Sequence, residues 1–345
     1  MTGTEPAKRW IIPNKGLCML LATLLLIVGL ILLVYGADRL VYGAAAIARS
    51  FGVPPMIIGM TIVGIGTSLP ELTVSLTAVM NNQINTAVGT VIGSNIANIL
   101  LILGGAAILR PLSVRSDILR RELPLMLGVT ILCGFVLYDN QLTRVDGALL
   151  ILAFAAFMWL MLKMARLAMR DGNDPLTDEQ MAELPKDTSN TVALLWIALG
   201  LIILPLSAKI IVDNSTVIAR YFGVSELVIG LTIIAIGTSL PELATSIAGA
   251  IKGEHDIVLG NIIGSNIFNI LIVLGVPALI SQGDTQFDPS AFSRDYWVML
   301  GVSVMLTALC IRRKHKIGRK AGALLLCGFV AYVVLLFIHQ PIDMY

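Results

Sequence analysis

The chain has 345 residues, of which 57% are hydrophobic and 13% are charged, and its formal net charge is +2. A soluble domain carries about 25% charged residues, so the composition disfavours a water-soluble fold and favours a membrane protein. A net charge this close to zero gives no indication of a nucleic-acid partner.

Ten apolar segments follow one another along the chain, and we predict a transmembrane helix for each. The first segment begins with the apolar stretch Leu17–Gly36, which basic residues precede, but its length of about 20 residues and the lack of a clean cleavage site disfavour a signal peptide. The predicted segments are 17–47, 56–80, 86–109, 118–138, 144–165, 191–219, 226–250, 257–281, 292–311 and 321–339.

A polar stretch with six acidic residues separates the segments into two sets of five. We therefore predict an N-terminal tail at 1–16, a first five-helix repeat at 17–165, a linker at 166–190 and a second five-helix repeat at 191–345. Most Lys and Arg residues of the loops fall on the side of the linker. By the positive-inside rule, both termini are predicted outside and the linker in the cytoplasm.

The two halves repeat one another without a gap, at a constant offset of 171 residues. Because each unit has five spans, the second copy enters the membrane from the opposite face. Inverted repeats of this kind place the substrate site near the midplane, on interrupted helices where the copies meet. The matching blocks are IGMTIVGIGTSLPEL (58–72) with IGLTIIAIGTSLPEL (229–243), GTVIGSNIANILLILG (89–104) with GNIIGSNIFNILIVLG (260–275), and IARSFGV (47–53) with IARYFGV (218–224).

Each repeat holds one carboxylate at bilayer depth, at equivalent positions. Glu71 is the only charged residue in 50–109, and Glu242 is the only one in 227–251. A carboxylate at the centre of a membrane helix costs about 2.5–3.5 kcal/mol on translocon scales, so two of them require a compensating function. The alternative is a structural role for a protonated Glu.

Polar residues surround each carboxylate. Thr67 and Ser68 lie four and three residues before Glu71, on the same face of a helix. Pro70 removes a backbone N–H and frees the carbonyl of Gly66, so the helix is interrupted there. Hydroxyl, carboxylate and carbonyl oxygens therefore gather at the break. The second repeat offers Thr238, Ser239, Glu242, Pro241 and Gly237, and the following spans add the pairs Ser94 with Asn98 and Ser265 with Asn269.

The predicted ligands are all oxygens, with no His or Cys within the pattern. This composition disfavours zinc and copper and favours hard cations, of which Ca²⁺ takes 6–8 oxygens in irregular geometry. Two carboxylates balance one Ca²⁺ or two Na⁺, so exchange of more than two Na⁺ for one Ca²⁺ would move net charge. The small residues could also serve helix packing alone, and Asn95 and Asn266 could pack or cap a helix break.

GTSLPEL with GSNIxNI, present twice in opposite topology, resembles the paired repeats of the sodium/calcium exchanger superfamily, most closely its bacterial inner-membrane members. The resemblance covers residues 17–340. It implies an all-α fold of ten transmembrane helices in two inverted five-helix repeats, with Ca²⁺ and Na⁺ as the transported ions. We also predict a monomeric transport unit and no cofactor.

The resemblance also implies roles for individual residues. Glu71 and Glu242 would bind both ions. Many members carry Asp where this chain has Asn269, including potassium-dependent relatives, so the neutral amide argues against K⁺ co-transport. The remaining implied ligands are Thr67, Thr238 and the backbone of Gly64 and Ala235 at the central sites, Ser68, Ser94, Ser239 and Ser265 at flanking Na⁺ sites, and Asn98 and Asn269 at the midplane.

We therefore predict an electrogenic Na⁺/Ca²⁺ antiporter that works by alternating access. The alternative is an antiporter that exchanges Ca²⁺, or another cation, for H⁺ at the same Glu pair. A cation channel is less compatible with one chain that supplies both halves of the site. An intramembrane enzyme would need paired Asp, Ser/His, Ser/Lys or HExxH arrangements, which the sequence lacks.

Overall fold

A computed structural model describes residues 15–114, 119–171, 189–223, 235–281, 285–311 and 316–338. Among these residues, seven helices are long and apolar enough to cross a membrane, and a bent pair makes an eighth. The apolar stretch Glu122–Leu137 is shorter, and the seventh predicted span begins in residues that are not described. All ten predicted segments are helical over most of the residues that the structure describes. Most of the linker predicted at 166–190, and most of the predicted tail, lie outside the described residues.

The first repeat contains one bent span and one long span that each carry a π-helical turn. The bent span turns by 43° at Ser68, where two helical pieces meet. In order, the elements are α1 (Lys15–Phe51), α2 (Pro55–Ile58), η1 (Gly59–Val63), α3 (Gly64–Thr67), α4 (Leu69–Met80), α5 (Ile84–Ala97), η2 (Asn98–Ile102), α6 (Leu103–Leu109), β1 (Leu112–Ser113), α7 (Leu119–Leu137) and α8 (Arg144–Asp171).

The second repeat follows the same plan, with a break at Ser239 and a π-helical turn at Asn269. Its elements are α10 (Asn190–Tyr221), α12 (Ala235–Thr238), α13 (Leu240–Lys252), α14 (His255–Phe268), η4 (Asn269–Leu274), α15 (Gly275–Ile280), η5 (Ala291–Tyr296), α16 (Trp297–Ile311), β2 (Lys316–Ile317) and α17 (Arg319–Ile338). The short strands β1 and β2 pair antiparallel and connect the loop between α6 and α7 to the loop between α16 and α17.

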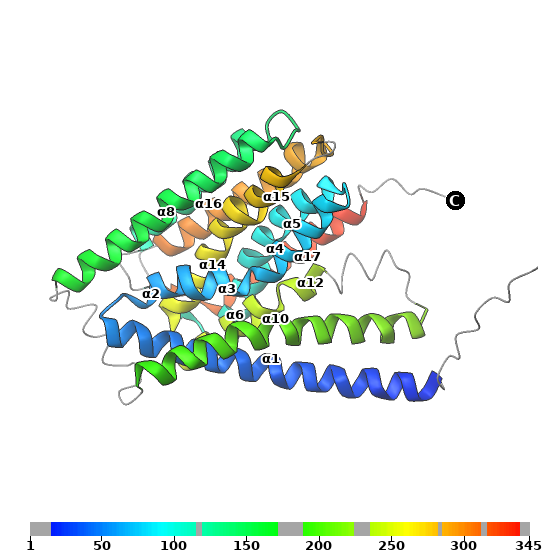
Figure 1. Cartoon of the computed structure of the whole chain (residues 1–345), viewed down its shortest axis with the longest axis horizontal. Helices are drawn as coiled ribbons and strands as arrows, with labels where there is room; N and C mark the ends of the chain where they lie inside the picture. Colours follow the sequence, from blue (N-terminus) through cyan, green and yellow to red (C-terminus); the bar gives the residue numbers. More distant parts are fainter. Residues whose placement is uncertain are drawn as a thin grey trace, which may run out of the picture.

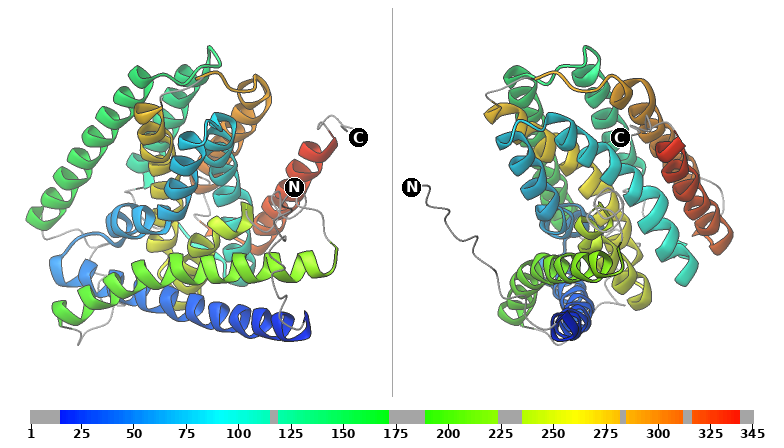
Figure 2. Two further views of the ribbon diagram at one scale, coloured as in Figure 1. Left: turned by 45° about the vertical axis from the view of Figure 1, so that its right-hand side comes forward. Right: turned by 90° about the vertical axis from the view of Figure 1, so that its right-hand side faces the viewer.

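The long helices α1 and α10 run side by side at one edge of the molecule and pack against the bundle of the other helices (Figures 1 and 2). Glycines permit their close approach. A Cβ added at Gly43 would lie 2.6 Å from the carbonyl oxygen of Ala193, and one added at Gly200 would lie 2.7 Å from Cβ of Leu40. Small residues allow this backbone-to-backbone packing between membrane helices.

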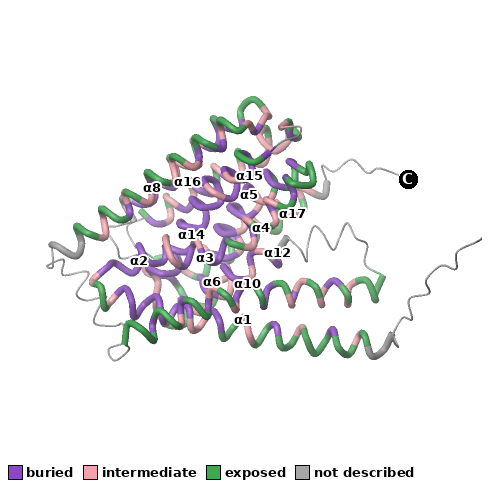
Figure 3. The backbone as a smooth tube through the Cα atoms, in the orientation of Figure 1, coloured by how far each residue is buried: buried purple, intermediate pink, exposed green. Residues whose placement is uncertain are grey.

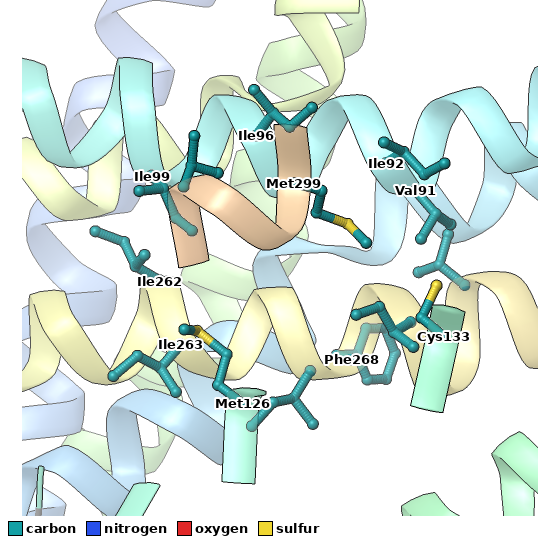
Figure 4. Close-up of a cluster of buried hydrophobic side chains, with 14 of the residues drawn as sticks. Val91, Ile92, Ile96, Ile99, Met126, Cys133, Ile262, Ile263, Phe268 and Met299 are labelled. Atoms are coloured by element: carbon teal, nitrogen blue, oxygen red, sulfur yellow. The ribbon is translucent and has the colours of Figure 1, made fainter. Parts of the chain in front are cut away.

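The bundle is buried at its centre and apolar on its outside, as expected for a protein surrounded by lipid. The outward faces of α1, α8 and α10 are exposed, whereas α14 is buried along its length (Figure 3). Isoleucines of α5 and α14 pack with Met126 of α7 and Met299 of α16 in the main apolar cluster (Figure 4). This apolar cluster encloses a small set of polar residues, which form the candidate cation-binding site.

Candidate cation-binding site

The two broken helices interrupt at equivalent residues with nearly identical backbone geometry. Ser68 has φ −88° and ψ 10°, and Ser239 has φ −91° and ψ 9°. Pro70 and Pro241 lie in the first turn of the helix that follows each break, where a missing N–H is tolerated. Each break therefore leaves its Ser at the end of one helical piece and brings its Glu into the first turn of the next.

The two carboxylates are held by hydrogen bonds that cross between the repeats. The hydroxyl of Ser68 donates to Glu242 Oε1 at 2.9 Å, and the hydroxyl of Ser239 donates to Glu71 Oε1 at 3.2 Å. These two bonds are equivalent under the 171-residue offset. Glu71 is 1% exposed and Glu242 is 2% exposed, so both carboxylates lie deep inside the protein. Each carboxylate is positioned by the other repeat, and neither half of the chain forms this arrangement alone.

Four asparagines form a second symmetric set one helix away. The Nδ2 of Asn98 donates to Asn266 Oδ1 at 2.9 Å, and the Nδ2 of Asn269 donates to Asn95 Oδ1 at 3.1 Å. Asn98 and Asn269 are the first residues of η2 and η4, and such π-helical turns occur frequently at functional sites. The sequence left open whether Asn95 and Asn266 cap or pack. In the structure they orient the amides of Asn98 and Asn269.

Four buried oxygens of these two sets have no hydrogen-bond donor among the described residues: Glu71 Oε2, Glu242 Oε2, Asn98 Oδ1 and Asn269 Oδ1. Buried polar atoms are nearly always satisfied, because an unsatisfied one costs about 1–3 kcal/mol. Each belongs to a side chain whose other polar atom is already fixed by a hydrogen bond across the repeats. Oriented acceptors without donors are the chemistry of a cation ligand, and these four are all oxygens.

The other predicted ligands lie around the same breaks but not in equivalent surroundings. The hydroxyl of Ser265 donates to the carbonyl of Gly64 at 3.2 Å, and the hydroxyl of Thr67 donates toward Gly64 O and toward Asn261 Oδ1. Ser94 is 7% exposed, and Thr238 is half-buried at the end of α12. Ala235 is the first residue of α12.

A cavity of about 500 Å³ opens beside the site, between the two repeats. Its walls come from α4, α5 and η2 of the first repeat and from α12 and α17 of the second, and they include the predicted ligands Ser94, Thr238 and Ser239. The equivalent surface of the second repeat is closed, since Gly260 of α14 packs so tightly on α2 and η1 that an added Cβ would lie 2.5 Å from the carbonyl oxygen of Met56. The described residues thus leave a cavity at one end of the site and pack closely at the other.

Comparison with known proteins gives the same fold and assigns a family. The family model for sodium/calcium exchanger proteins matches residues 21–163 and 192–338. The chain is 59% identical to inner membrane protein YrbG of Escherichia coli, over 94% of this chain and 99% of that protein. It is 49% identical to the putative antiporter CaxA of Alkalimonas amylolytica, over 92% of this chain and 99% of that protein.

A solved structure extends the comparison to three dimensions. The sodium/calcium exchanger from Methanococcus jannaschii superposes with a TM-score of 0.78 at 31% identity, covering 92% of this chain and 98% of the other. The same exchanger soaked without Na⁺ and Ca²⁺ gives a TM-score of 0.77.

Fold and site together define a multi-pass membrane transporter of inorganic cations, built from two inverted five-helix repeats. The chain belongs to the sodium/calcium exchanger family. Members of this family are transporters rather than enzymes, and the chain is a cation/calcium antiporter.

Proposed function

We propose that the chain exchanges Na⁺ for Ca²⁺ across the cell membrane by alternating access, at one site shared by Glu71 and Glu242. The observation that carries the proposal is the pair of cross-repeat bonds Ser68–Glu242 and Ser239–Glu71, with one oxygen of each carboxylate left as an acceptor. A site whose ligands come from both repeats can be exposed to either side by moving the repeats against one another.

The charge of the proposed site fits these ions. Two ionised carboxylates balance one Ca²⁺ or two Na⁺, while the amides of Asn98 and Asn269 add oxygens without charge. A third Na⁺ would leave one excess positive charge, so exchange of three or more Na⁺ for one Ca²⁺ is electrogenic. We assign Ser68 and Ser239, which hold the carboxylates, and Ser94 and Ser265 to flanking Na⁺ positions. We assign Thr67, Thr238 and the backbone of Gly64 and Ala235 to the central sites.

The asymmetry of access supports alternating access. The end of the site near Ser94 and Ser239 opens into the cavity, and the end near Ser265 and Thr67 is closed, with both residues 0% exposed. By the positive-inside rule, the cavity faces outward, both termini lie outside and the central linker is cytoplasmic. We place the protein in the bacterial inner membrane, with one chain as the transport unit, two repeats at 17–165 and 191–345, and a linker at 166–190.

The proposal is tested by Ca²⁺ uptake into proteoliposomes that contain the purified protein. Vesicles loaded with Na⁺ and diluted into Na⁺-free buffer should take up Ca²⁺, and a protonophore should not stop that uptake. Uptake driven by a pH gradient and indifferent to Na⁺ would replace the proposal with Ca²⁺/H⁺ exchange. Addition of K⁺ to either side should leave the rate unchanged.

A further inference from the structure

The two repeats differ at one polar position next to the site. Asn261 of α14 corresponds to Thr90 of α5 under the 171-residue offset, although the residues around both are nearly the same. Asn261 is 1% exposed, whereas Thr90 lines the cavity. An Asn in this position has two N–H donors and a carbonyl acceptor with which to join three helices, whereas a Thr hydroxyl has a single donor.

Asn261 connects one piece of the first broken helix to the second broken helix. Its Oδ1 accepts a hydrogen bond of 3.1 Å from Thr67, and its Nδ2 donates to Thr245 Oγ1 at 3.2 Å and to Ser246 Oγ at 3.3 Å. The hydroxyl of Thr245 donates in turn to the carbonyl of Pro241 at 2.7 Å. The chain of bonds runs from α3 through α14 to α13.

The sequence of the first repeat cannot supply both of the bonds that the Asn261 amide donates to α13. Thr90 donates to Thr86 O of its own helix at 2.7 Å. The counterpart of Thr245 is Val74, which has no polar side-chain atom, and the counterpart of Ser246 is Ser75, which donates to Ala87 O at 3.3 Å. Val74 and Thr90 both line the cavity. Closing that end would therefore not create the same network.

We propose that Asn261 is a positioning residue that ties Thr67 to α13 at the closed end of the site, and that Thr90 in its place in the first repeat makes the two ends of the transporter unequal. The inference rests on the proposed exchange by alternating access. It extends that proposal by naming the residue that favours the conformation in which the cavity is open and the opposite end is sealed.

A kinetic asymmetry follows. The apparent affinity for a ligand is proportional to the fraction of protein that is open to its side, so a face that is rarely open binds more weakly. The KM for Ca²⁺ should therefore be lower at the cavity face than at the closed face. Loss of the Asn261 network should lower the KM at the closed face by about fivefold and raise it slightly at the cavity face, as expected for the loss of hydrogen bonds of ordinary strength.

The test compares wild type with Asn261→Thr, which gives the second repeat the residue of the first, and with the double variant Val74→Thr/Thr90→Asn, which introduces the second-repeat residues into the first. Both changes should shift the protein toward the opposite conformation, in which the cavity is closed and the end near Asn261 is open. Thr130→Val is the matched control, because Thr130 is also buried but donates only to Met126 O of its own helix, at 2.8 Å.

Two readouts separate this inference from the proposed function. Backbone hydrogen exchange, measured without Ca²⁺ or Na⁺, should rise in residues 56–67 for Asn261→Thr and not for Thr130→Val. The KM for Ca²⁺ at the closed face divided by the KM at the cavity face should fall about fivefold in both test variants. Right-side-out and inside-out vesicles give the two KM values. Unchanged exchange in Asn261→Thr and an unchanged KM ratio in the double variant would overturn the role of Asn261. If wild type carries no Na⁺-driven Ca²⁺, the proposed function fails, while hydrogen exchange still decides the network.

Discussion

The hydroxyl of Ser68, in the first repeat, donates a hydrogen bond of 2.9 Å to Glu242, in the second. Its counterpart joins Ser239 to Glu71 at 3.2 Å. Each half of the chain therefore orients the carboxylate of the other, and the free oxygens of both carboxylates remain as acceptors. Any motion that separates the repeats must change both of these hydrogen bonds at once.

Glu71→Gln and Glu242→Gln should each abolish Ca²⁺ uptake while leaving expression and membrane insertion intact. Each substitution keeps the shape of the side chain and removes one of the two charges that balance Ca²⁺. Proteoliposome uptake with radioactive Ca²⁺ measures the effect. Asp213→Asn is the control, since Asp213 is 62% exposed and pairs with Lys209 on the surface of α10, where an ion pair contributes about 0–1 kcal/mol. Uptake at the wild-type rate by either Gln variant would contradict the role of the pair.

Ser68→Ala and Ser239→Ala should weaken cation affinity to a similar extent, by about tenfold each, because each removes one hydrogen bond to an ionised carboxylate. The two bonds are equivalent by symmetry, so one Ser should not dominate. The Ca²⁺ concentration for half-maximal uptake measures the loss. A loss at one Ser more than tenfold larger than the loss at the other would contradict the equivalence of the two bonds.

Gly93→Ala should fold like wild type but slow the exchange cycle. Among the residues that the structure describes, none lies within 4 Å of a Cβ added at Gly93, which lines the cavity, whereas a Cβ at its counterpart Gly264 would lie 2.5 Å from Cα of Met60. If the two ends close in the same way, the added methyl group would obstruct closure of the cavity. The maximal rate of Ca²⁺ exchange should fall with thermal stability unchanged. Gly264→Ala should instead lower stability by about 1–3 kcal/mol. Equal behaviour of the two variants would contradict the assignment of one open and one closed end.

Asn269→Asp should change ion selectivity and make transport more dependent on pH. The Nδ2 of Asn269 donates to Asn95 Oδ1, and a carboxyl group there would add a third titratable residue to the site and lose that donor when ionised. Uptake measured across a pH series, with and without K⁺, tests this. Identical pH profiles for wild type and variant would contradict it. Asn98→Asp is the equivalent change in the first repeat, because Asn98 donates the corresponding hydrogen bond to Asn266.

Much of this molecule could be predicted from its sequence, because a lone carboxylate in an apolar span has few explanations. The repeat offset identified Glu71 and Glu242 as equivalent, and the breaks at Ser68 and Ser239 occur beside Pro70 and Pro241 as the pattern predicted. The ten spans were predicted in the correct order, and they match the fold of the exchanger structures. The assignment of individual ligands to ions remains a prediction.

The sequence could not give the contacts between repeats. An offset shows which residues are equivalent, but hydrogen-bond partners depend on how the helices cross, so the pairing of Asn95 with Asn269 emerged only in three dimensions. The Asn261 network was missed for a different reason. Its signal, a Thr in one copy and an Asn in the other, is visible when the blocks are aligned, but its meaning depends on the closed packing of α14.

The central claim is that the two repeats form one shared site, and the most direct test is equilibrium Ca²⁺ binding to the purified protein with Na⁺ as competitor. Isothermal titration should give one Ca²⁺ per chain, displaced by Na⁺, with binding lost in both Glu71→Gln and Glu242→Gln. Two Ca²⁺ ions per chain, each lost in only one of the two variants, would show that each repeat binds its own ion and would contradict the shared site.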